Sequence, residues 1–161
     1  MNCSSLFIKN TEVGKGVFTN KDFKIGETVF EFQGGLFTSE ELPNPYSEVE
    51  GHYVQIDKNL YMGHSGGMDD FFNHSCDPNT GLKIIDNMVF LIVIKKIKTD
   101  DQITWDYSTT MDEDNWTMNY NCGYKNCRKI IRDFKYPPIN IQKKYLKLKI
   151  IPKYILDNIK K

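Results

Sequence analysis

One short stretch of the chain combines side chains that rarely occur together outside a binding site. Residues 71–79 read Phe-Phe-Asn-His-Ser-Cys-Asp-Pro-Asn, so amides, an imidazole, a hydroxyl and a thiol follow two aromatic rings. A core strand would carry aliphatic side chains, and a solvated turn would have no use for two phenylalanines. Polar groups buried beside aromatic rings must find hydrogen-bond partners. The stretch therefore predicts a buried, irregular segment at a functional site.

Two further segments suit the approach of a ligand. Gly14-Lys15-Gly16 precedes the apolar pair Val17 and Phe18, and its glycines allow positive φ and close contact. We expect a turn at Gly14–Gly16 between short strands near 7–9 and 17–19. Residues 102–107, Gln-Ile-Thr-Trp-Asp-Tyr, predict another strand that ends in a tyrosine hydroxyl.

Together these segments resemble the motifs of one family. Phe72–Asn79 is similar to the Asn-His-Ser-Cys-x-Pro-Asn signature of SET-domain protein lysine methyltransferases. Gly14–Phe18 resembles that family's opening glycine turn, and Gln102–Tyr107 resembles its closing strand. The order and rough spacing also agree, over about residues 5–130. The resemblance implies a mainly β protein with the SET β-clip fold, in which the signature threads under a loop as a pseudoknot, and a short C-terminal helical segment.

The resemblance also implies a reaction, the transfer of a methyl group from S-adenosyl-L-methionine to a lysine side chain. The implied cofactor contacts are Lys15, Gly16, Val17, Asn73, His74 and Tyr107. Tyr107 matches the family's catalytic tyrosine, whose hydroxyl orients the amine and supports developing charge. Because the reference pKa of lysine is about 10.4, a desolvating channel that disfavours the ammonium form helps to deliver it uncharged.

Aromatic residues are the candidates for the walls of that channel. Tyr53 is one candidate, and Tyr46 and Tyr61 remain open because no spacing argument separates them. Trp105 stands where the family usually has Phe or Tyr, at a position that influences how many methyl groups are added. Asp70 lies where histone-directed members commonly have Arg, so the resemblance does not define the substrate.

The cysteines resemble an incomplete zinc site. Asn121–Arg128 is similar to the family's post-SET pattern, Cys-x-Cys-Gly-x-x-x-Cys-Arg, whose three cysteines join the signature cysteine around zinc. Cys76, Cys122 and Cys127 match, but Tyr120 occupies the place of the first post-SET cysteine. Structural zinc almost always has four protein ligands. We therefore expect no metal and free thiols, in a flap that covers the cofactor through Tyr120, Tyr124 or the backbone near Cys122.

The rest of the pattern predicts many short strands followed by helices. Alternation predicts strands at 28–32, 53–57 and 60–62, and the apolar run 88–97 predicts a central strand. Residues 39–42 predict one helical turn, with a surface loop after it to Gly51, and 141–148 and 152–159 show helical spacing. The expected organisation is a SET core at 1–110, a post-SET-like flap at 111–135, and a basic helical tail at 136–161 packed on the same domain.

Composition limits the class of protein. A hydrophobic content of 40% in 161 residues supports one packed domain. Val89–Ile94 is too short to cross a membrane, and residues 1–5 lack a basic and apolar signal. We therefore expect an intracellular soluble protein without membrane contact, nuclear if its target is a histone and otherwise cytoplasmic.

The formal net charge of zero conceals a strong asymmetry. Residues 128–161 hold eleven Lys and Arg and two acids, so the tail carries +9 and the remainder −9. An acidic body attracts a basic lysine-containing protein such as a histone, whereas the tail offers nucleic acid a surface that we do not expect it to use. The function predicted is a protein lysine N-methyltransferase. The alternatives are a non-catalytic SET-fold module that binds a peptide or nucleic acid, and a zinc-dependent interaction domain.

Overall fold

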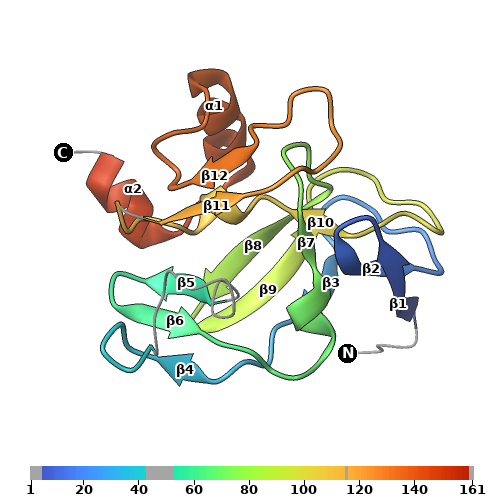
Figure 1. Cartoon of the computed structure of the whole chain (residues 1–161), viewed down its shortest axis with the longest axis horizontal. Helices are drawn as coiled ribbons and strands as arrows, with labels where there is room; N and C mark the ends of the chain where they lie inside the picture. Colours follow the sequence, from blue (N-terminus) through green and yellow to red (C-terminus); the bar gives the residue numbers. More distant parts are fainter. Residues whose placement is uncertain (1–4, 43–52, 115, 160–161) are drawn as a thin grey trace.

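The computed structural model of the chain describes residues 5–42, 53–114 and 116–159. Strands predominate in it, and two α-helices follow them near the C-terminus (Figure 1). The elements are β1 (Leu6–Thr11), β2 (Gly14–Thr19), β3 (Thr28–Glu31), β4 (Leu36–Phe37), β5 (Val54–Asp57), β6 (Leu60–Met62), the 3₁₀-helix η2 (Met68–Phe71), β7 (Asn73–His74), β8 (Thr80–Ile85), β9 (Met88–Val93), β10 (Thr104–Trp105), the 3₁₀-helix η3 (Tyr107–Thr109), β11 (Thr117–Asn119), β12 (Ile130–Arg132), α1 (Ile139–Leu148) and α2 (Lys153–Ile159).

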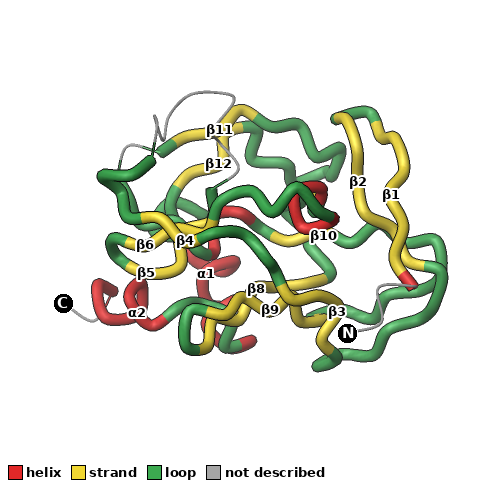
Figure 2. Tube along the Cα trace, turned by 90° about the horizontal axis from the view of Figure 1, so that it is seen from below, coloured by secondary structure: helices red, strands yellow, loops and turns green. Residues whose placement is uncertain are grey.

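The strands form several small sheets. Among the described residues, β3, β9 and β8 form one three-stranded antiparallel sheet, and β4, β6 and β5 form another. The β1–β2 hairpin lies at one end of the molecule and α2 at the opposite end (Figure 1, Figure 2). As predicted, the apolar strand β9 is central in its sheet, and Val89, Leu91 and Val93 are buried in the main core.

The β8–β9 hairpin depends on two residues in the left-handed region. Asp86 and Asn87 join the strands with φ of 49° and 63°. A two-residue loop with positive φ at both positions fits the twist of antiparallel strands, and Asp and Asn tolerate that conformation better than most residues. We did not predict β8, because the segment 80–85 shows no clear alternation between apolar and polar residues.

The signature segment pairs with a strand far away in the sequence. β7 lies parallel to β10, with Asn73 opposite Thr104 and His74 opposite Trp105. Asn79 continues the connection, since its side-chain amide donates to the Gln102 carbonyl at 2.8 Å and accepts from the Thr104 N–H at 3.0 Å. The signature is thus held against the closing strand by backbone and side-chain hydrogen bonds, which is the kind of threading that the predicted pseudoknot needs.

The C-terminal helices have a hydrophobic cluster of their own. Tyr145 of α1 and Tyr154 and Ile155 of α2 pack with Phe134 and with Ile84 of β8. The Tyr154 hydroxyl donates to the backbone carbonyls of residues 55 and 110. The helices are therefore tied both to the β-sheet layer and to the segment that follows η3.

Several predicted boundaries are wrong. The first turn is formed by residues 12–13, so Gly14–Gly16 lies inside β2, and Gly14 alone has positive φ, +104°. The strand predicted to reach Ile97 ends at Val93, because the N–H groups of residues 94 and 95 turn to the carbonyl of Asn79, and Ile97 forms only an isolated bridge with Phe23. Residues 39–41 form a turn without a helix. The loop predicted from 43 onward lies outside the described residues up to position 52.

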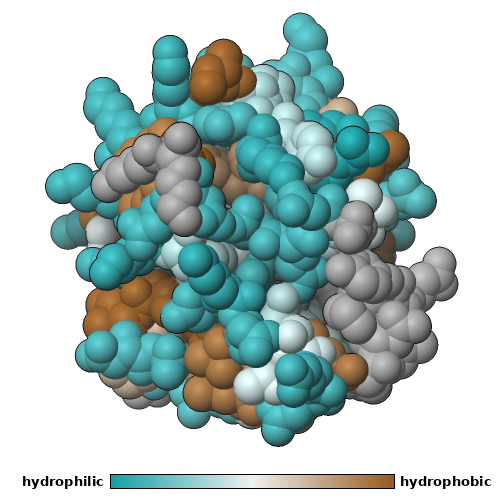
Figure 3. Space-filling model, turned by 90° about the vertical axis from the view of Figure 1, so that its left-hand side faces the viewer, coloured by the Kyte–Doolittle hydropathy of each residue, from teal (hydrophilic) through white to brown (hydrophobic). Residues whose placement is uncertain are grey.

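Within the part of the chain that the structure describes, neither helix has the length and apolar character needed to cross a bilayer. The face on the left in Figure 1 is mainly hydrophilic, and its hydrophobic atoms gather in separate patches (Figure 3). Burial of apolar side chains is thus concentrated in the clusters between the elements.

Candidate active site

The β7–β10 ladder is a wall between two cavities. Phe72, which precedes β7, and Trp105 of β10 line a cavity of about 40 Å³. Their neighbours Asn73, His74 and Thr104 line a different cavity of about 380 Å³. Residues next to one another in the sequence thus line cavities on opposite sides of the β7–β10 pair. A wall of this kind can separate two ligands and still let their reactive ends meet.

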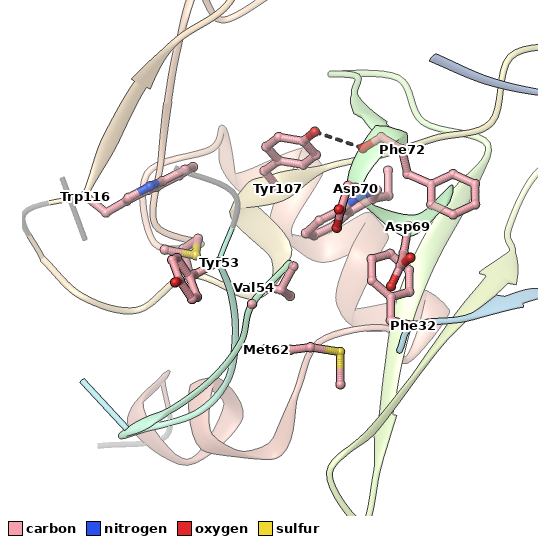
Figure 4. A pocket seen from close by; sticks show the side chains of 12 residues that line it. Phe32, Tyr53, Val54, Met62, Asp69, Asp70, Phe72, Tyr107 and Trp116 are labelled. Atoms are coloured by element: carbon pink, nitrogen blue, oxygen red, sulfur yellow. Dashed lines mark hydrogen bonds between the residues drawn. The ribbon is translucent and has the colours of Figure 1, made fainter. Parts of the chain in front are cut away.

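The smaller cavity is mainly aromatic. Its walls include Phe32, Tyr53, Phe72, Trp105, Tyr107 and Trp116, with the carboxylates of Asp69 and Asp70 beside them (Figure 4). Asp69 accepts a hydrogen bond from the Gln33 N–H at 2.8 Å, and Asp70 accepts from the Ser65 and Gly66 N–H groups. A cavity of this kind suits an aliphatic chain that carries a positive charge at its entrance.

The larger cavity is polar and carries both signs of charge. Glu12, Asp77 and Asp101 line it together with Lys95 and Lys96. Asp77 accepts a hydrogen bond from Lys95 at 2.8 Å, and the ion pair lowers the pKa of Asp77 below its ordinary value. Such a surface can bind a zwitterionic or a mixed polar ligand.

Tyr107 lies where the two cavities approach each other. Its hydroxyl donates to the Phe72 carbonyl at 2.8 Å (Figure 4). Its backbone N–H donates to His74 Nδ1 at 3.2 Å. Its ring lies 4.6 Å from the Trp105 ring between centroids. Burial raises the pKa of Tyr107 well above its ordinary value, so the phenol keeps its proton at neutral pH. The predicted strand ends earlier, because the Asp106 side chain accepts from the Ser108 N–H and begins η3 at Tyr107.

His74 is neutral, and its tautomer follows from its neighbours. Desolvation lowers its pKa to about 4, although Asp106 opposes this shift. Because a backbone N–H can only donate, Nδ1 must be the acceptor and the ring proton must be on Nε2. Nε2 lies 3.3 Å from Cys76 Sγ, so the imidazole donates to that sulfur.

Asn73 and Gly16 form one tight contact beside the larger cavity. The Asn73 amide donates to the Lys15 carbonyl at 2.9 Å. A Cβ at Gly16 would lie 2.9 Å from Asn73 Nδ2 and would also meet the Gln102 amide. Glycine is therefore needed at position 16 so that β2 can approach the signature closely. The sequence did not predict Gln102 as a residue of this contact. Its position in the closing strand was the signal that could have indicated it.

Not every predicted site residue lies at a cavity. Val17 is fully buried in the core, and the Lys15 side chain lies over the Phe71 ring at 5.3 Å. The part of this hairpin that lines the larger cavity is its tip, residues 11–13. Tyr53 lines the smaller cavity, whereas its competitor Tyr61 is buried in β6 and Tyr46 lies outside the described residues.

The segment predicted as a flap reaches both cavities. Tyr120, Cys122 and Tyr124 line the larger one, and Trp116 lines the smaller one. The Tyr120 ring meets His74 edge to face at 5.3 Å, and its hydroxyl is buried without a hydrogen-bond partner among the described residues. That hydroxyl is thus available to a ligand. Trp116 was missed as a wall residue, and an isolated tryptophan in a polar stretch was its only signal.

The thiols do not form a donor set that fits structural zinc. Within the described residues, His74, Cys76 and Cys122 place one possible ligand atom each within 4.8 Å of one another. His74 offers a protonated Nε2 there, and burial raises the pKa of the Cys76 thiol to about 12. Cys127 donates to the Tyr120 carbonyl at 3.5 Å, and its thiol also contacts the Cys122 side chain. Because His74 Nε2 carries the ring proton and Tyr120 replaces the first post-SET cysteine, three thiols remain, one fewer than the ligands that such zinc requires.

Comparison with known proteins identifies the family. The model of the SET domain matches residues 14–108, more than half of the chain. The chain belongs to the SET domain family. The curated SET relatives include trithorax, a histone-lysine N-methyltransferase of Drosophila virilis, 29% identical over 129 residues that cover 73% of this chain. They also include histone-lysine N-methyltransferase 2D of Homo sapiens, 24% identical over 72% of this chain, and the variant-silencing SET domain-containing protein of Plasmodium falciparum, 31% identical over 64%.

These SET relatives are much longer proteins. The matched region is 3% of trithorax, 2% of methyltransferase 2D and 5% of the variant-silencing protein. A crystal structure of KRYPTONITE in complex with mCHH DNA, an H3(1-15) peptide and SAH has the same SET fold, with a TM-score of 0.63. The two chains are 21% identical, and the match covers 79% of this chain and 29% of the KRYPTONITE chain. The predicted family and the predicted SET fold, mainly β with short C-terminal helices, are therefore confirmed.

Proposed function

We propose that this SET protein is a protein lysine N-methyltransferase that uses S-adenosyl-L-methionine and acts on a basic protein such as a histone. The observation that carries the proposal is the position of the Tyr107 hydroxyl, on the wall between an aromatic cavity and a polar one. Relatives named as histone-lysine N-methyltransferases support the proposed methyl transfer to lysine. The SAH in the KRYPTONITE complex supports this cofactor.

The larger cavity is assigned to the cofactor. S-adenosyl-L-methionine carries an ammonium group, a carboxylate and an adenosine, and when bound it supplies a methyl group on a positively charged sulfur. The acids Asp77 and Asp101 and the lysines Lys95 and Lys96 offer partners for the charged ends. Asn73 and His74 form the wall toward Tyr107, and Tyr120 and Tyr124 provide apolar ring surface from the flap.

The smaller cavity is assigned to the lysine side chain. Tyr53 and Trp105 enclose its aliphatic part, and their rings exclude water. Desolvation disfavours the ammonium form, so the channel lowers the cost of removing the proton before transfer. Asp69 and Asp70 attract the incoming cation, and the larger acidic body extends this field.

Tyr107 is assigned as the catalytic residue. Its hydroxyl already points at the Phe72 carbonyl, which leaves the oxygen lone pairs available to accept a hydrogen bond from the amine. Accepting that bond aims the nitrogen lone pair along the path to the methyl group. The protonated phenol and the carbonyl are preorganised dipoles that stabilise the redistribution of charge during transfer.

We also propose the division of the chain that the sequence predicts. The cluster around β3, β8 and β9 supports a SET core at 1–110, and the cluster of Met111, Trp116 and Ile131 supports a flap at 111–135. The helical cluster supports a basic tail at 136–161 packed on the same domain. An enzyme with a histone substrate works in the nucleus, which is the location we propose.

The experiment is to incubate the purified chain with labelled S-adenosyl-L-methionine and either core histones or a histone H3 peptide. We expect label on lysine, located by mass spectrometry, and none on the same peptide with arginine in place of the modified lysine. Calorimetric titration with S-adenosyl-L-methionine accompanies it. Cofactor binding without transfer to any basic protein would support the non-catalytic module instead, and the absence of binding would refute the assignment of the cavity.

A further inference from the structure

The flap covers both cavities, yet its thiols lack the fourth ligand that a structural zinc needs. We propose that a buried ion pair between Arg128 and Asp106 closes the flap without a metal, and that by closing it these residues position Tyr107. We call this pair the latch. The latch goes beyond the proposed function, and only the positioning of Tyr107 rests on that function.

The geometry of the latch is that of a strong pair. Arg128 Nη1 lies 2.8 Å from Asp106 Oδ2, and Nη2 lies 2.6 Å from Oδ1, so the guanidinium and carboxylate meet through two parallel hydrogen bonds. The side chain of Asp106 is 0% exposed and that of Arg128 is 15% exposed. Burial alone would raise the pKa of Asp106, but Arg128, together with His74 and Ser108, outweighs burial and lowers it.

The carboxylate is bonded on every side. Tyr145 of α1 donates to Asp106 Oδ2 at 3.0 Å, and the Ser108 hydroxyl donates to Oδ1 at 2.8 Å. A buried carboxylate is stable only when its charge is paired and its lone pairs are used. The flap, η3 and α1 therefore converge on one side chain.

Arg128 holds the flap at a second point. Its backbone N–H donates to Cys76 Sγ at 3.4 Å, and Cys76 in turn receives the His74 imidazole at 3.3 Å. One residue of the flap thus contacts both the signature and the segment that follows β10. These are the contacts that a shared thiolate-bound ion would otherwise supply between the same two parts of the chain.

The latch is next to the reacting groups. Asp106 directly precedes Tyr107, and its Oδ1 lies 3.7 Å from His74 Nδ1, the atom that accepts the Tyr107 N–H. Opening the pair would release the turn that Asp106 caps and so move the Tyr107 ring. Arg128, Asp106 and Tyr145 do not line either cavity, so their role is one of positioning.

The test of the latch does not depend on catalysis. Alkylation of Cys76 by iodoacetamide, followed by peptide mass spectrometry, reports opening of the flap in folded protein. We expect about tenfold faster alkylation of Cys76 in Arg128→Gln, an intermediate rate in Arg128→Lys, and the wild-type rate in the matched control Arg132→Gln, which removes an exposed arginine from the same flap. Asp106→Asn in the Arg128→Gln background is expected to add little, because its partner is already gone.

A chelator is the complementary arm. Wild-type protein treated with a zinc chelator is expected to alkylate at its untreated rate, and metal analysis is expected to find less than one zinc per ten chains. Faster alkylation after chelation would show that a metal holds the flap and would overturn the latch. A wild-type rate in Arg128→Gln would overturn it as well.

The positioning part is tested at saturating cofactor and peptide, below the melting temperature of each variant. Arg128→Gln is expected to lower kcat about tenfold, with partial rescue by Arg128→Lys, whereas a purely structural role would leave kcat unchanged in the folded fraction. An unchanged kcat refutes the positioning role. Wild-type protein that transfers no methyl group refutes the proposed function, while the alkylation rates decide the latch in either case.

Discussion

The Tyr107 hydroxyl donates a hydrogen bond to the Phe72 carbonyl across 2.8 Å, and this bond joins the closing segment to the residue that begins the signature. The two residues are separated by 35 positions in the sequence but line the same cavity. The bond fixes the phenol at the point where the aromatic channel reaches the wall of the polar cavity. A methyl donor on one side and an amine on the other would meet beside this oxygen.

Substitution of Gly16 tests the close packing of β2 against the signature. Gly16→Ala places a methyl group against Asn73 and Gln102, so we expect about tenfold weaker binding of S-adenosyl-L-methionine and a stability loss of about 1–3 kcal/mol. Calorimetry and urea denaturation measure the two effects. The control is Gly35→Ala, whose new methyl group would meet only the edge of the Phe37 ring, at 3.3 Å. Equal cofactor affinity in both variants would contradict the role of Gly16.

Substitution of Trp105 tests the volume of the channel. The indole is 5% exposed, lines the smaller cavity and packs on Tyr107. Trp105→Phe removes volume beside the amine, so room for a methylated lysine increases and the product is expected to shift toward higher methylation states. Mass spectrometry of the peptide over time measures the distribution. An unchanged distribution at equal turnover would mean that Trp105 does not limit the channel.

The pH dependence of stability contains two opposing contributions. His74 has its pKa lowered to about 4 from 6.5, so the stability that it contributes is complete above pH 6.5 and is lost as pH falls. Asp133, whose pKa is raised to about 6 from 3.8 by burial, contributes stability below pH 3.8 that is lost as pH rises through 6. The two trends partly cancel in the wild type.

The substitution Asp133→Asn separates the contribution of Asp133 to the pH dependence of stability from that of His74. The variant lacks the acid, so its stability relative to wild type is expected to rise by about 2 kcal/mol between pH 4 and pH 7, the part of a shift of about two pKa units that falls in this range. Urea denaturation at several pH values measures the difference, in which the contributions of other groups cancel. A difference that is constant with pH would refute the raised pKa of Asp133.

The sequence predicts the parts of the site that lie in the motifs and misses those that depend on folding. Asn73, His74 and Tyr107 were predicted to come together, because residue types at motif spacing carry that information, and the structure places them around one wall. Trp116 and Gln102 were not predicted, because a single tryptophan or amide has no local pattern that shows which surface it will meet.

Element boundaries show the same limit. Tyr107 was expected to end a strand, but the Asp106 side chain caps a 3₁₀ turn there. That carboxylate is available as a cap because it is buried with Arg128, 22 positions further on. No window of local sequence contains this partner, so propensity alone assigns the wrong structure to the segment.

The central claim is that Tyr107 acts on an amine at the junction of two cavities, and Tyr107→Phe tests it most directly. The variant keeps the ring and loses only the hydroxyl. We predict that the rate of methyl transfer to a histone H3 peptide at saturating substrates falls about 100-fold, as for loss of one preorganised catalytic group. The affinity for S-adenosyl-L-methionine, measured by calorimetry, is expected to change less than about twofold, because the hydroxyl faces the smaller cavity. Transfer at the wild-type rate with unchanged cofactor affinity would contradict the account.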